Sequence, residues 1–555
     1  MKVSRRSSWT ALTLAALALA ACGGSDDAES ESTTVASASA AEATDAASTD
    51  TDVSDATAPA TSASATTAPG GEDTAAAEPT GTLRVYNDFG AGTWDAPLAL
   101  GGPQGAVLSH VFDRVIHIDP TGAPIPGIAE SWEFDDTNTV LTLTLREGLS
   151  FTDGTPLDGT AVAAALNRNR SVEGSTLAGL MSNIAEVEAI DPLTVQVTQN
   201  QPDVSLVLLL ADRAGMIMSP SSFDDPDIAE NPVGSGMFKL VSQDPDVKYI
   251  LERNPDYWDA EAVKVAGVEW NVLGAAEARV SALQSGQADI VLVQGEQAAL
   301  SEGLIETVTG PSSWVGMMQI NPERVPAYAD PRVRQAISHA IDRVGITESL
   351  LFGTGEPSLQ LLPPGHWAYN DELDATGAYD PDLARELLAE AGFESGIVIN
   401  AVVASPRSDT IATAIQAQLA EVGITVNLEP LPGTGAGQKY WTDKQTDAII
   451  ASFTGRPDPS IAYSALYTAP QFLNPGSLTT DEMTALIAQS KSTSDPDERA
   501  TILRDVAALV AEDPLGLIPL WTDTQVLGIS DEVEGLEVYV NTWINLEGVS
   551  LTGGS

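Results

Sequence analysis

The chain contains a single cysteine, Cys22, among its 555 residues. One thiol cannot form a disulfide within the chain, and it cannot supply the set of cysteine ligands that many structural zinc sites use. The fold must therefore be held together by the burial of apolar side chains. The chain from Gly81 onward is long enough for this, because large chains bury most of the surface that they expose when unfolded, usually in two or three domains.

Residues 1–21 have the layout of a secretory signal peptide. Basic residues at positions 2, 5 and 6 precede an apolar run over 9–21. This run is shorter than the roughly 20 residues of a membrane-spanning helix, so we expect it to be cleaved. Leu19-Ala20-Ala21-Cys22 resembles the bacterial lipobox, in which lipid is attached to the cysteine. The resemblance predicts an exported protein anchored through Cys22 to the outer face of the cytoplasmic membrane, which is the cell surface in a Gram-positive bacterium and the periplasmic side otherwise.

Residues 22–80 are rich in Ala, Ser and Thr, carry many acidic side chains, and contain no Lys or Arg. Such a segment has too few large apolar side chains to offset the free-energy cost of ordering its backbone. We therefore expect a lipid-anchored, disordered acidic tether that ends where the folded part of the chain begins.

The formal net charge of the chain is −52 at pH 7. A protein that binds nucleic acid neutralises phosphates with clustered Lys and Arg, so this charge excludes nucleic acid as a partner. The acidity is compatible with a cationic solute, but solubility outside the cell is the simpler explanation.

Strand and helix patterns alternate along the rest of the chain. Apolar and polar side chains alternate over 82–86 and 140–146, which predicts two strands. Apolar residues recur at helical spacing over 410–422, and an alternating strand pattern follows over 424–428. The segment 495–498 has the cap, proline and glutamate of a helix start. These patterns predict a mixed α/β fold without internal repeats.

Several segments of the chain resemble, in the same order, the family 5 extracellular solute-binding proteins, a group that contains binders of dipeptides, oligopeptides, nickel and opines. The segments include Ala129-Glu130-Ser131-Trp132, Asp153-Gly154-Thr155-Pro156, Asn231-Pro232-Val233-Gly234, Asn254-Pro255-Asp256-Tyr257, Asp330-Pro331-Arg332-Val333 and Tyr379-Asp380-Pro381. The resemblance extends over essentially all of residues 81–550.

This resemblance implies a two-lobed periplasmic-binding-protein-like fold of type II, with an extra domain and lobes joined by hinge strands. We expect a discontinuous main lobe from 81–122, 220–320 and 519–555, an extra small domain over 123–219, and a second lobe over 321–518. The resemblance further implies a monomer without cofactor or metal. It would capture a peptide-like or other small organic solute between the lobes, close by a hinge motion, and deliver the solute to the permease of an ABC transporter.

Most of the matching residues also have a purely structural interpretation. Asp153-Gly154-Thr155-Pro156 is a turn sequence, and Val333, Ile337 and Ile341 form the apolar stripe of a helix. The matching segments therefore identify the scaffold and not the solute.

The alternative class is a secreted hydrolase or peptide-processing enzyme. The four histidines, His110, His117, His339 and His366, are scattered and form no His-Glu-x-x-His pair. Gly433, Gly435 and Gly437 lack the Gly-Lys of a phosphate-binding loop, so we interpret them as a flexible turn. The sequence therefore does not favour an enzyme.

The segment 452–459 bears on the identity of the solute. In peptide-binding members of the family, the matching stretch carries an Asp that holds the peptide amino terminus. Here Gly455 occupies that position and Arg456 follows it, so the resemblance argues against recognition of a free amino terminus. Arg456 is suited to binding a carboxylate or phosphate, or it lies on the surface or pairs with an acid such as Asp458. Alternatively, Asp458 has taken over the binding of the amine.

Aromatic side chains are expected in the walls of such a site. The candidates near the expected lobe boundary, each of which is as well explained as part of the core, are Trp94, Trp314, Phe453 and Trp521.

Overall fold

The structure is a computed structural model that describes residues 79–405 and 408–552. All of these residues belong to one compact unit, Thr74–Ser555. The predicted signal peptide, Cys22 and nearly all of the predicted tether lie outside the described residues. None of the helices in the described part is long and apolar enough to cross a membrane.

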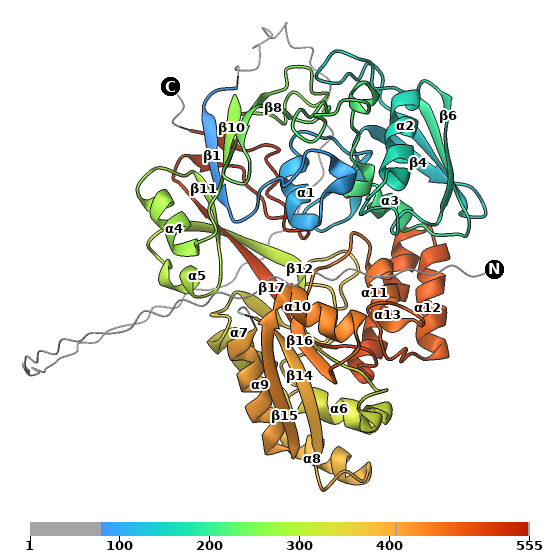
Figure 1. Ribbon diagram of the computed structural model, residues 1–555, viewed down its shortest axis with the longest axis vertical. Helices are drawn as coiled ribbons and strands as arrows, with labels where there is room; N and C mark the ends of the chain where they lie inside the picture. The colour runs from blue at the N-terminus through green and yellow to red at the C-terminus, as the bar shows by residue number, and fades with distance from the viewer. Residues whose placement is uncertain (1–78, 406–407, 553–555) are drawn as a thin grey trace, which may run out of the picture. The chain divides into compact units, whose positions relative to one another are not determined.

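The largest element is an 11-stranded mixed sheet in the order β15-β14-β16-β12-β17-β11-β1-β10-β9-β8, with β13 paired to β17 (Figure 1). Its strands are β1 (Thr82–Asn87), β8 (Phe238–Asp244), β9 (Lys248–Arg253), β10 (Gly267–Val272), β11 (Ile290–Val293), β12 (Glu306–Ile320), β13 (Gly355–Pro357), β14 (Ile397–Ser405), β15 (Ile424–Pro432), β16 (Ala448–Phe453) and β17 (Ile518–Ile529). The predicted strands at 82–86 and 424–428 correspond to β1 and β15.

The two long strands β12 and β17 connect the two halves of this sheet. Residues 526–529 of β17 pair with β11, whereas residues 315–320 of β12 pair with β16. The two strands pair with each other along most of their length, but the register shifts between Pro311 and Val315. Because a bulge re-aims the side chains around it, residues 312–314 leave the regular alternation at the junction between the halves.

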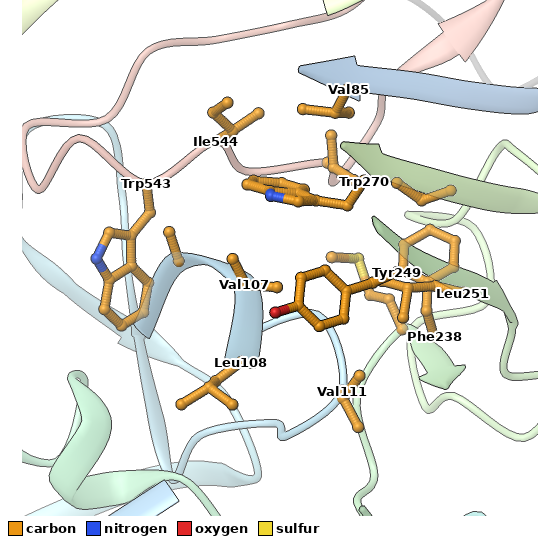
Figure 2. Packing of buried hydrophobic residues seen from close by; sticks show 14 of the residues in the cluster. Val85, Val107, Leu108, Val111, Phe238, Tyr249, Leu251, Trp270, Trp543 and Ile544 are labelled. Carbon is orange, nitrogen blue, oxygen red and sulfur yellow. The ribbon is translucent and has the colours of Figure 1, made fainter. Parts of the chain in front are cut away.

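The first half, which contains β1 and β8–β11, packs against helix α1 (Gly102–Leu108). Figure 2 shows this core, in which Tyr249 and Trp270 from the sheet meet Val107 and Leu108 from α1. The chain after β17 returns to the same core and contributes Trp543 and Ile544, together with the short strands β18 (Val533–Glu534) and β19 (Ser550–Leu551). This half therefore joins residues from both ends of the described chain.

A separate four-stranded antiparallel sheet has the order β4-β5-β7-β6. Its strands are β4 (Ala129–Phe134), β5 (Val140–Leu145), β6 (Ile184–Asp191) and β7 (Thr194–Gln199), and helix α2 (Gly159–Ser171) covers it. The predicted alternation in β5 is confirmed, because Leu141, Leu143 and Leu145 are buried. The predicted turn is also confirmed, because Asp153 accepts a hydrogen bond from the Thr155 backbone N–H and Gly154 has φ +80°.

Helices cover the second half of the large sheet. The helices not yet described, from here and from the rest of the chain, are α3 (Leu206–Leu209), α4 (Ala276–Gln284), α5 (Glu296–Leu300), α6 (Pro331–His339), α7 (Arg343–Ser349), α8 (Pro381–Glu390), α9 (Asp409–Glu421), α10 (Gly433–Gly437), α11 (Pro459–Tyr467), α12 (Asp481–Ser492) and α13 (Pro496–Glu512). The helix predicted over 410–422 is α9. The predicted start of α13 is confirmed, because Asp495 accepts a hydrogen bond from the Glu498 N–H.

One local prediction is wrong. Gly433, Gly435 and Gly437 form the short helix α10 instead of a flexible turn, and the chain continues in a helical turn over Gln438–Thr442. Ala436 and Tyr440, which are four residues apart and therefore on one helical face, are both fully buried. Burial of these two side chains outweighs the low helix propensity of glycine.

Candidate ligand-binding site

Two neighbouring cavities lie at the junction marked by the β12 bulge. The narrow cavity has a volume of about 150 Å³, and the wide cavity has a volume of about 610 Å³. Both are lined by Pro103, Trp314, Thr542 and Trp543. Concave sites with aromatic walls and a few polar groups are typical places for small organic ligands, so we treat the two cavities together as the candidate ligand-binding site.

The narrow cavity is built from segments that are far apart in sequence. Leu208 and Ala211 to Arg213 follow the small sheet, and Ser313 and Trp314 lie in the β12 bulge. Phe453 ends β16, Thr454 to Pro457 lie in the loop after it, and Val540 to Trp543 come from the C-terminal part. The wide cavity adds Phe89 and Phe352 as aromatic walls.

Arg456 is the main charged side chain that the loop after β16 presents to the narrow cavity. Its guanidinium carbon lies 5.2 Å from the centre of the Phe453 ring, and it makes no hydrogen bond or ion pair with any other described residue. Burial lowers the pKa of Arg456, the charge of Asp212 acts to raise it, and the charge of Arg213 lowers it further. An arginine keeps its positive charge even so, and its donors remain available for an acceptor.

Arg213 is a second guanidinium on the lining of the same cavity. Only 7% of Arg213 is exposed, and its Nη1 donates to the carbonyl of Ala99 at 2.6 Å and to Thr176 Oγ1 at 3.2 Å. Its Nε has no hydrogen-bond partner, and the nearest carboxylate oxygen, on Asp212, is 4.0 Å away. Burial lowers the pKa of Arg213 and Asp212 partly opposes this. Two guanidiniums and one carboxylate give this part of the cavity a net positive character.

Gly455 lies so close to Ser313 that a residue with a Cβ atom would not fit at this position. A Cβ atom at this position would lie 2.5 Å from Ser313 Cβ and 2.8 Å from the Ser313 carbonyl oxygen. The loop after β16 is therefore held against the β12 bulge at Gly455, and an aspartate side chain has no room there without a backbone shift.

The family model described as "Bacterial extracellular solute-binding proteins, family 5 Middle" matches residues 123–474 of this chain. The chain belongs to this family. The glutathione-binding protein GsiB of Shigella dysenteriae serotype 1 is 28% identical over 444 residues, which cover 76% of this chain and 85% of GsiB. GsiB of Escherichia coli O157:H7 matches with the same identity and coverage.

Solved structures of similar proteins show the same fold. The peptide-bound periplasmic binding protein DppA of Helicobacter pylori has a TM-score of 0.70 and 24% identity, and the match covers 85% of this chain and 99% of DppA. The substrate-binding protein CtaP of Listeria monocytogenes has a TM-score of 0.74 and 22% identity, and the match covers 86% of this chain and 100% of CtaP. The predicted two-lobed, type II periplasmic-binding-protein fold is thus confirmed. This family 5 protein is a substrate-binding protein of an ABC transporter, and the hydrolase alternative is not favoured.

Four of the residues expected at the solute site line the cavities of this family 5 protein. Trp314, Phe453, Gly455 and Arg456 all line the narrow cavity, and Trp314 also lines the wide one. The structure therefore brings together residues from the β12 bulge, the end of β16 and the loop that follows it.

The remaining three expected residues do not line either cavity. Trp94 and Trp521 are each 1% exposed. The Trp94 Nε1 donates to Gln243 Oε1 at 2.9 Å, whereas Trp521 packs against Gly316, where a Cβ atom would lie 2.0 Å from its ring. These tryptophans belong to the core.

Asp458 is fully buried and has structural partners. Its Oδ1 accepts hydrogen bonds from the Ser460 N–H at 2.8 Å and from Arg499 Nη2 at 2.7 Å, so Asp458 caps α11 and forms an ion pair. Burial acts to raise the pKa of Asp458, but Arg499 and Ser460 outweigh it and the pKa is lowered. Neither the expected amine-binding role of Asp458 nor its pairing with Arg456 agrees with this arrangement.

The sequence interpretation missed Arg213 and Trp543. Arg213 lies shortly after the apolar run 206–211, and Trp543 follows Asn541 and Thr542. Neither position carries a local motif, and each reaches the cavity only through the tertiary fold. In the described part of the chain, no group of three or more His, Cys, Asp or Glu side chains is arranged so that it could hold a metal ion.

Proposed function

We propose that this family 5 protein captures an anionic organic solute and that Arg456 binds a carboxylate or phosphate of that solute. The proposal rests on the Arg456 guanidinium, which lies in the cavity wall and has no hydrogen-bond acceptor among the described residues. Charge-assisted, bidentate hydrogen bonds to a carboxylate would satisfy it. Arg213, with its unpartnered Nε, supports the same preference from another wall of the cavity.

A free amino terminus is not part of the proposed recognition. The position that holds it in peptide-binding relatives is Gly455, which packs against Ser313, and the nearest aspartate in sequence, Asp458, is committed to Arg499. A buried ammonium without a carboxylate at contact distance costs several kcal/mol by order of magnitude. The nearby guanidiniums would repel it further.

We further propose that the solute is enclosed by closure of two lobes. The proposed division has a main lobe of 81–122, 220–320 and 519–555, an extra domain of 123–219 and a second lobe of 321–518. Under this division, Trp543, Arg213 and Arg456 come from the main lobe, the extra domain and the second lobe. The long strands β12 and β17 would then act as the hinge.

The proposed location is the outer face of the cytoplasmic membrane, where a lipid on Cys22 would retain the protein beside its permease as a monomer without cofactor. Replacement of Cys22 by Ser should move the protein from the membrane fraction to the soluble fraction, because stable anchoring depends on acyl chains. A Cys22→Ser variant that fractionates like the parent would contradict the anchor.

The test of solute class uses three probes. Glutathione is the ligand for which GsiB is named, and the peptide Ser-Thr-Ser-Ala and agropinic acid are bound in solved structures of similar proteins. Thermal shift first identifies which probes stabilise the protein, and calorimetry then gives Kd. For a peptide probe, acetylation of the amino terminus should change Kd by less than about 3-fold. Amidation of the carboxyl groups should raise Kd at least about 30-fold, because truncating one side of a buried charged pair costs roughly 2–5 kcal/mol.

Variants of the chain provide the matching test. Arg456→Ala should weaken binding at least about 30-fold, Arg456→Lys should weaken it less, and Thr454→Asp should weaken it by placing a negative charge in the cavity. Arg385→Ala removes an arginine from the exposed surface of α8 and serves as the matched control with unchanged Kd. Mass spectrometry of the recovered probes should show no turnover. Binding that is lost on acetylation but retained in Arg456→Ala would overturn the proposal, as would a failure of all three probes and of a wider carboxylate panel.

A further inference from the structure

A cluster of charged side chains lies behind the wall of the ligand-binding site. His117 on β2 (Ile116–Ile118) is 4% exposed and stands between two carboxylates. Its Nε2 is 2.6 Å from Asp113 Oδ1, and its Nδ1 is 3.4 Å from Glu547 Oε1. The cluster surrounds a small cavity of about 20 Å³ that shares Asn541 and Trp543 with the narrow cavity. The proposed solute contacts use none of the three titratable groups.

Glu547 belongs to a segment, residues 538–549, which we call the strap. The strap reaches both long connecting strands, because the Val540 carbonyl accepts from the Ser313 N–H of β12 at 2.8 Å. The Thr542 carbonyl accepts from Gln525 Nε2 of β17 at 3.0 Å. The strap therefore lies between the connecting strands and the buried cluster.

Trp543 is the residue of the strap that lines all three cavities, the small one, the narrow one and the wide one. Its indole packs against α1, as Figure 2 shows beside Leu108, and a Cβ atom on Gly105 would lie 2.6 Å from its ring. On the side of the buried cluster, the Arg114 guanidinium carbon is 5.3 Å from the ring centre. The position of Trp543 in the cavity wall therefore depends on how firmly the strap is held.

We propose that His117 is a positioning residue, which holds the strap and Trp543 in place through Glu547 while its imidazole is protonated and releases Glu547 when the proton is lost. A protonated imidazole donates from both ring nitrogens and can bind both carboxylates at once. A neutral imidazole has one N–H and must present a lone pair to the other carboxylate.

The contact that is lost on deprotonation is the one to Glu547. Asp113 is fixed by the Trp258 Nε1, which donates to its Oδ2 at 2.7 Å, and by the Arg114 N–H, which donates to its Oδ1 at 2.8 Å. The distance from His117 to Asp113 is also the shorter of the two. The remaining proton therefore stays on Nε2, and the lone pair of Nδ1 faces Glu547.

The direction of the pH dependence follows from the groups around His117. Burial acts to lower its pKa and Arg114 adds to this, but Asp113 and Glu547 outweigh both, so the pKa of His117 is raised. Burial acts to raise the pKa of Glu547, but its hydrogen bond and charge interaction with His117, the charge of Arg114 and a hydrogen bond with Asn545 together lower it. The contact is therefore present at mildly acidic pH and is lost as the pH rises through the raised pKa of His117, with a second loss in strong acid.

Three neighbouring titratable groups, His110, Tyr539 and Tyr257, keep their charge states at mildly acidic and neutral pH. Burial lowers the pKa of His110 to about 3 and raises that of Tyr539 to about 12, and the pKa of Tyr257 is raised well above its ordinary value. As the pH rises from mildly acidic values, the imidazole of His117 is thus the group whose charge decides the state of the strap.

The test is hydrogen exchange followed by mass spectrometry on the solute-free protein at pH 6 and pH 8, corrected for the intrinsic effect of pH. The reporters are the amides of Val540 and Gly548, which are bonded to the carbonyls of Pro120 and Ala262. In the parent, opening of the strap should increase on the order of tenfold at pH 8, which is the range for losing a hydrogen bond to a charged group. Peptides from β14 and β15 serve as the internal reference.

Two variants of equal charge separate the proposal from a general effect of pH. In Glu547→Gln the amide can accept from a protonated imidazole or donate to a neutral one, so the difference between pH 6 and pH 8 should disappear. In Glu537→Gln, which removes an exposed carboxylate one residue before the strap, the parent's pH dependence should remain. His117→Gln should also lose the dependence, and circular dichroism verifies that each variant is folded.

A parent strap whose exchange does not change between pH 6 and pH 8 would overturn the proposal, as would a change that persists in Glu547→Gln. The further expectation, that solute affinity falls at pH 8 in the parent and not in Glu547→Gln, rests on the proposed function. The exchange measurement contains no solute, so it fails or succeeds independently of the proposed solute class.

Discussion

The buried pair of Asp458 and Arg499 allows the structural and the ligand-binding interpretation of Asp458 to be separated. Asp458→Asn keeps an oxygen that can accept from the Ser460 N–H, so the helix cap is retained. It removes the charge that Arg499 Nη2 contacts at 2.7 Å. Because this leaves a guanidinium buried without its counter-ion, the free energy of unfolding should fall by about 3–5 kcal/mol.

The assay is a urea titration followed by circular dichroism and by tryptophan fluorescence, and free energies are compared only where the two transitions coincide. Arg499→Met and the double variant complete a double-mutant cycle. The double variant should cost clearly less than the sum of the single variants, because replacing a whole buried pair is far less harmful than breaking it. Solute affinity should change by less than about 2-fold, since Asp458 does not line the cavities.

Two results would refute this reasoning. A loss of stability below about 0.5 kcal/mol in Asp458→Asn would show that the ion pair is not structural, because surface substitutions fall in that range. A stable Asp458→Asn variant that no longer binds the solute would show that Asp458 takes part in solute binding. The pair also predicts the effect of acid: because the pKa of Asp458 is lowered by folding, its contribution to stability is present above the ordinary pKa and is lost as the pH falls through the lowered one.

Three further predictions concern the core, pH and closure. Gly316→Ala should destabilise the protein by about 1–3 kcal/mol or more in urea titrations, because its Cβ would lie 2.0 Å from the Trp521 ring. Gly274→Ala, whose Cβ would meet nothing within 4 Å, is the control. An equal loss of stability in the two variants would contradict the prediction. Burial lowers the pKa of His110 to about 3, and Arg114 adds to the effect. The unfolded chain therefore binds a proton at His110 that the folded protein does not, so stability should decrease as the pH falls below the ordinary value of 6.5, by about 2 kcal/mol at pH 5. His110→Phe should remove this loss of stability. A solute that stabilises the protein should also reduce the radius of gyration measured by small-angle scattering, and an unchanged radius would count against lobe closure.

Local patterns predicted most of the local structure. The alternating leucines and threonines of β5 identified both the strand and its buried face, since side chains on a strand point alternately to its two faces. The Asp495-Pro496 helix start was also correct. The same signal, an aspartate followed by a proline at the first helical position, is present in Asp458-Pro459 and would have predicted that Asp458 caps α11.

The candidate site was less predictable because it depends on contacts between distant segments. Trp314 and Trp521 both lie on the connecting strands, yet only Trp314 lines the cavity, because it stands in the β12 bulge, whereas Trp521 packs on Gly316. The sequence shows neither the bulge nor the side of the sheet that faces the cavity. Arg213 reaches the site from beside the small sheet, which no periodicity could indicate.

The return of the chain to its first core also has a consequence for biogenesis. β1 lies between β10 and β11, and the core that includes β1 is completed by Trp543 and Ile544 (Figure 2). Contacts over so many residues form late, because the loop between them must first be closed. During synthesis, neither this core nor the cavity wall that contains Trp543 can be completed until the strap has emerged. A shortened polypeptide without the strap would therefore expose apolar surface and be subject to proteolysis before it could compete for the transporter.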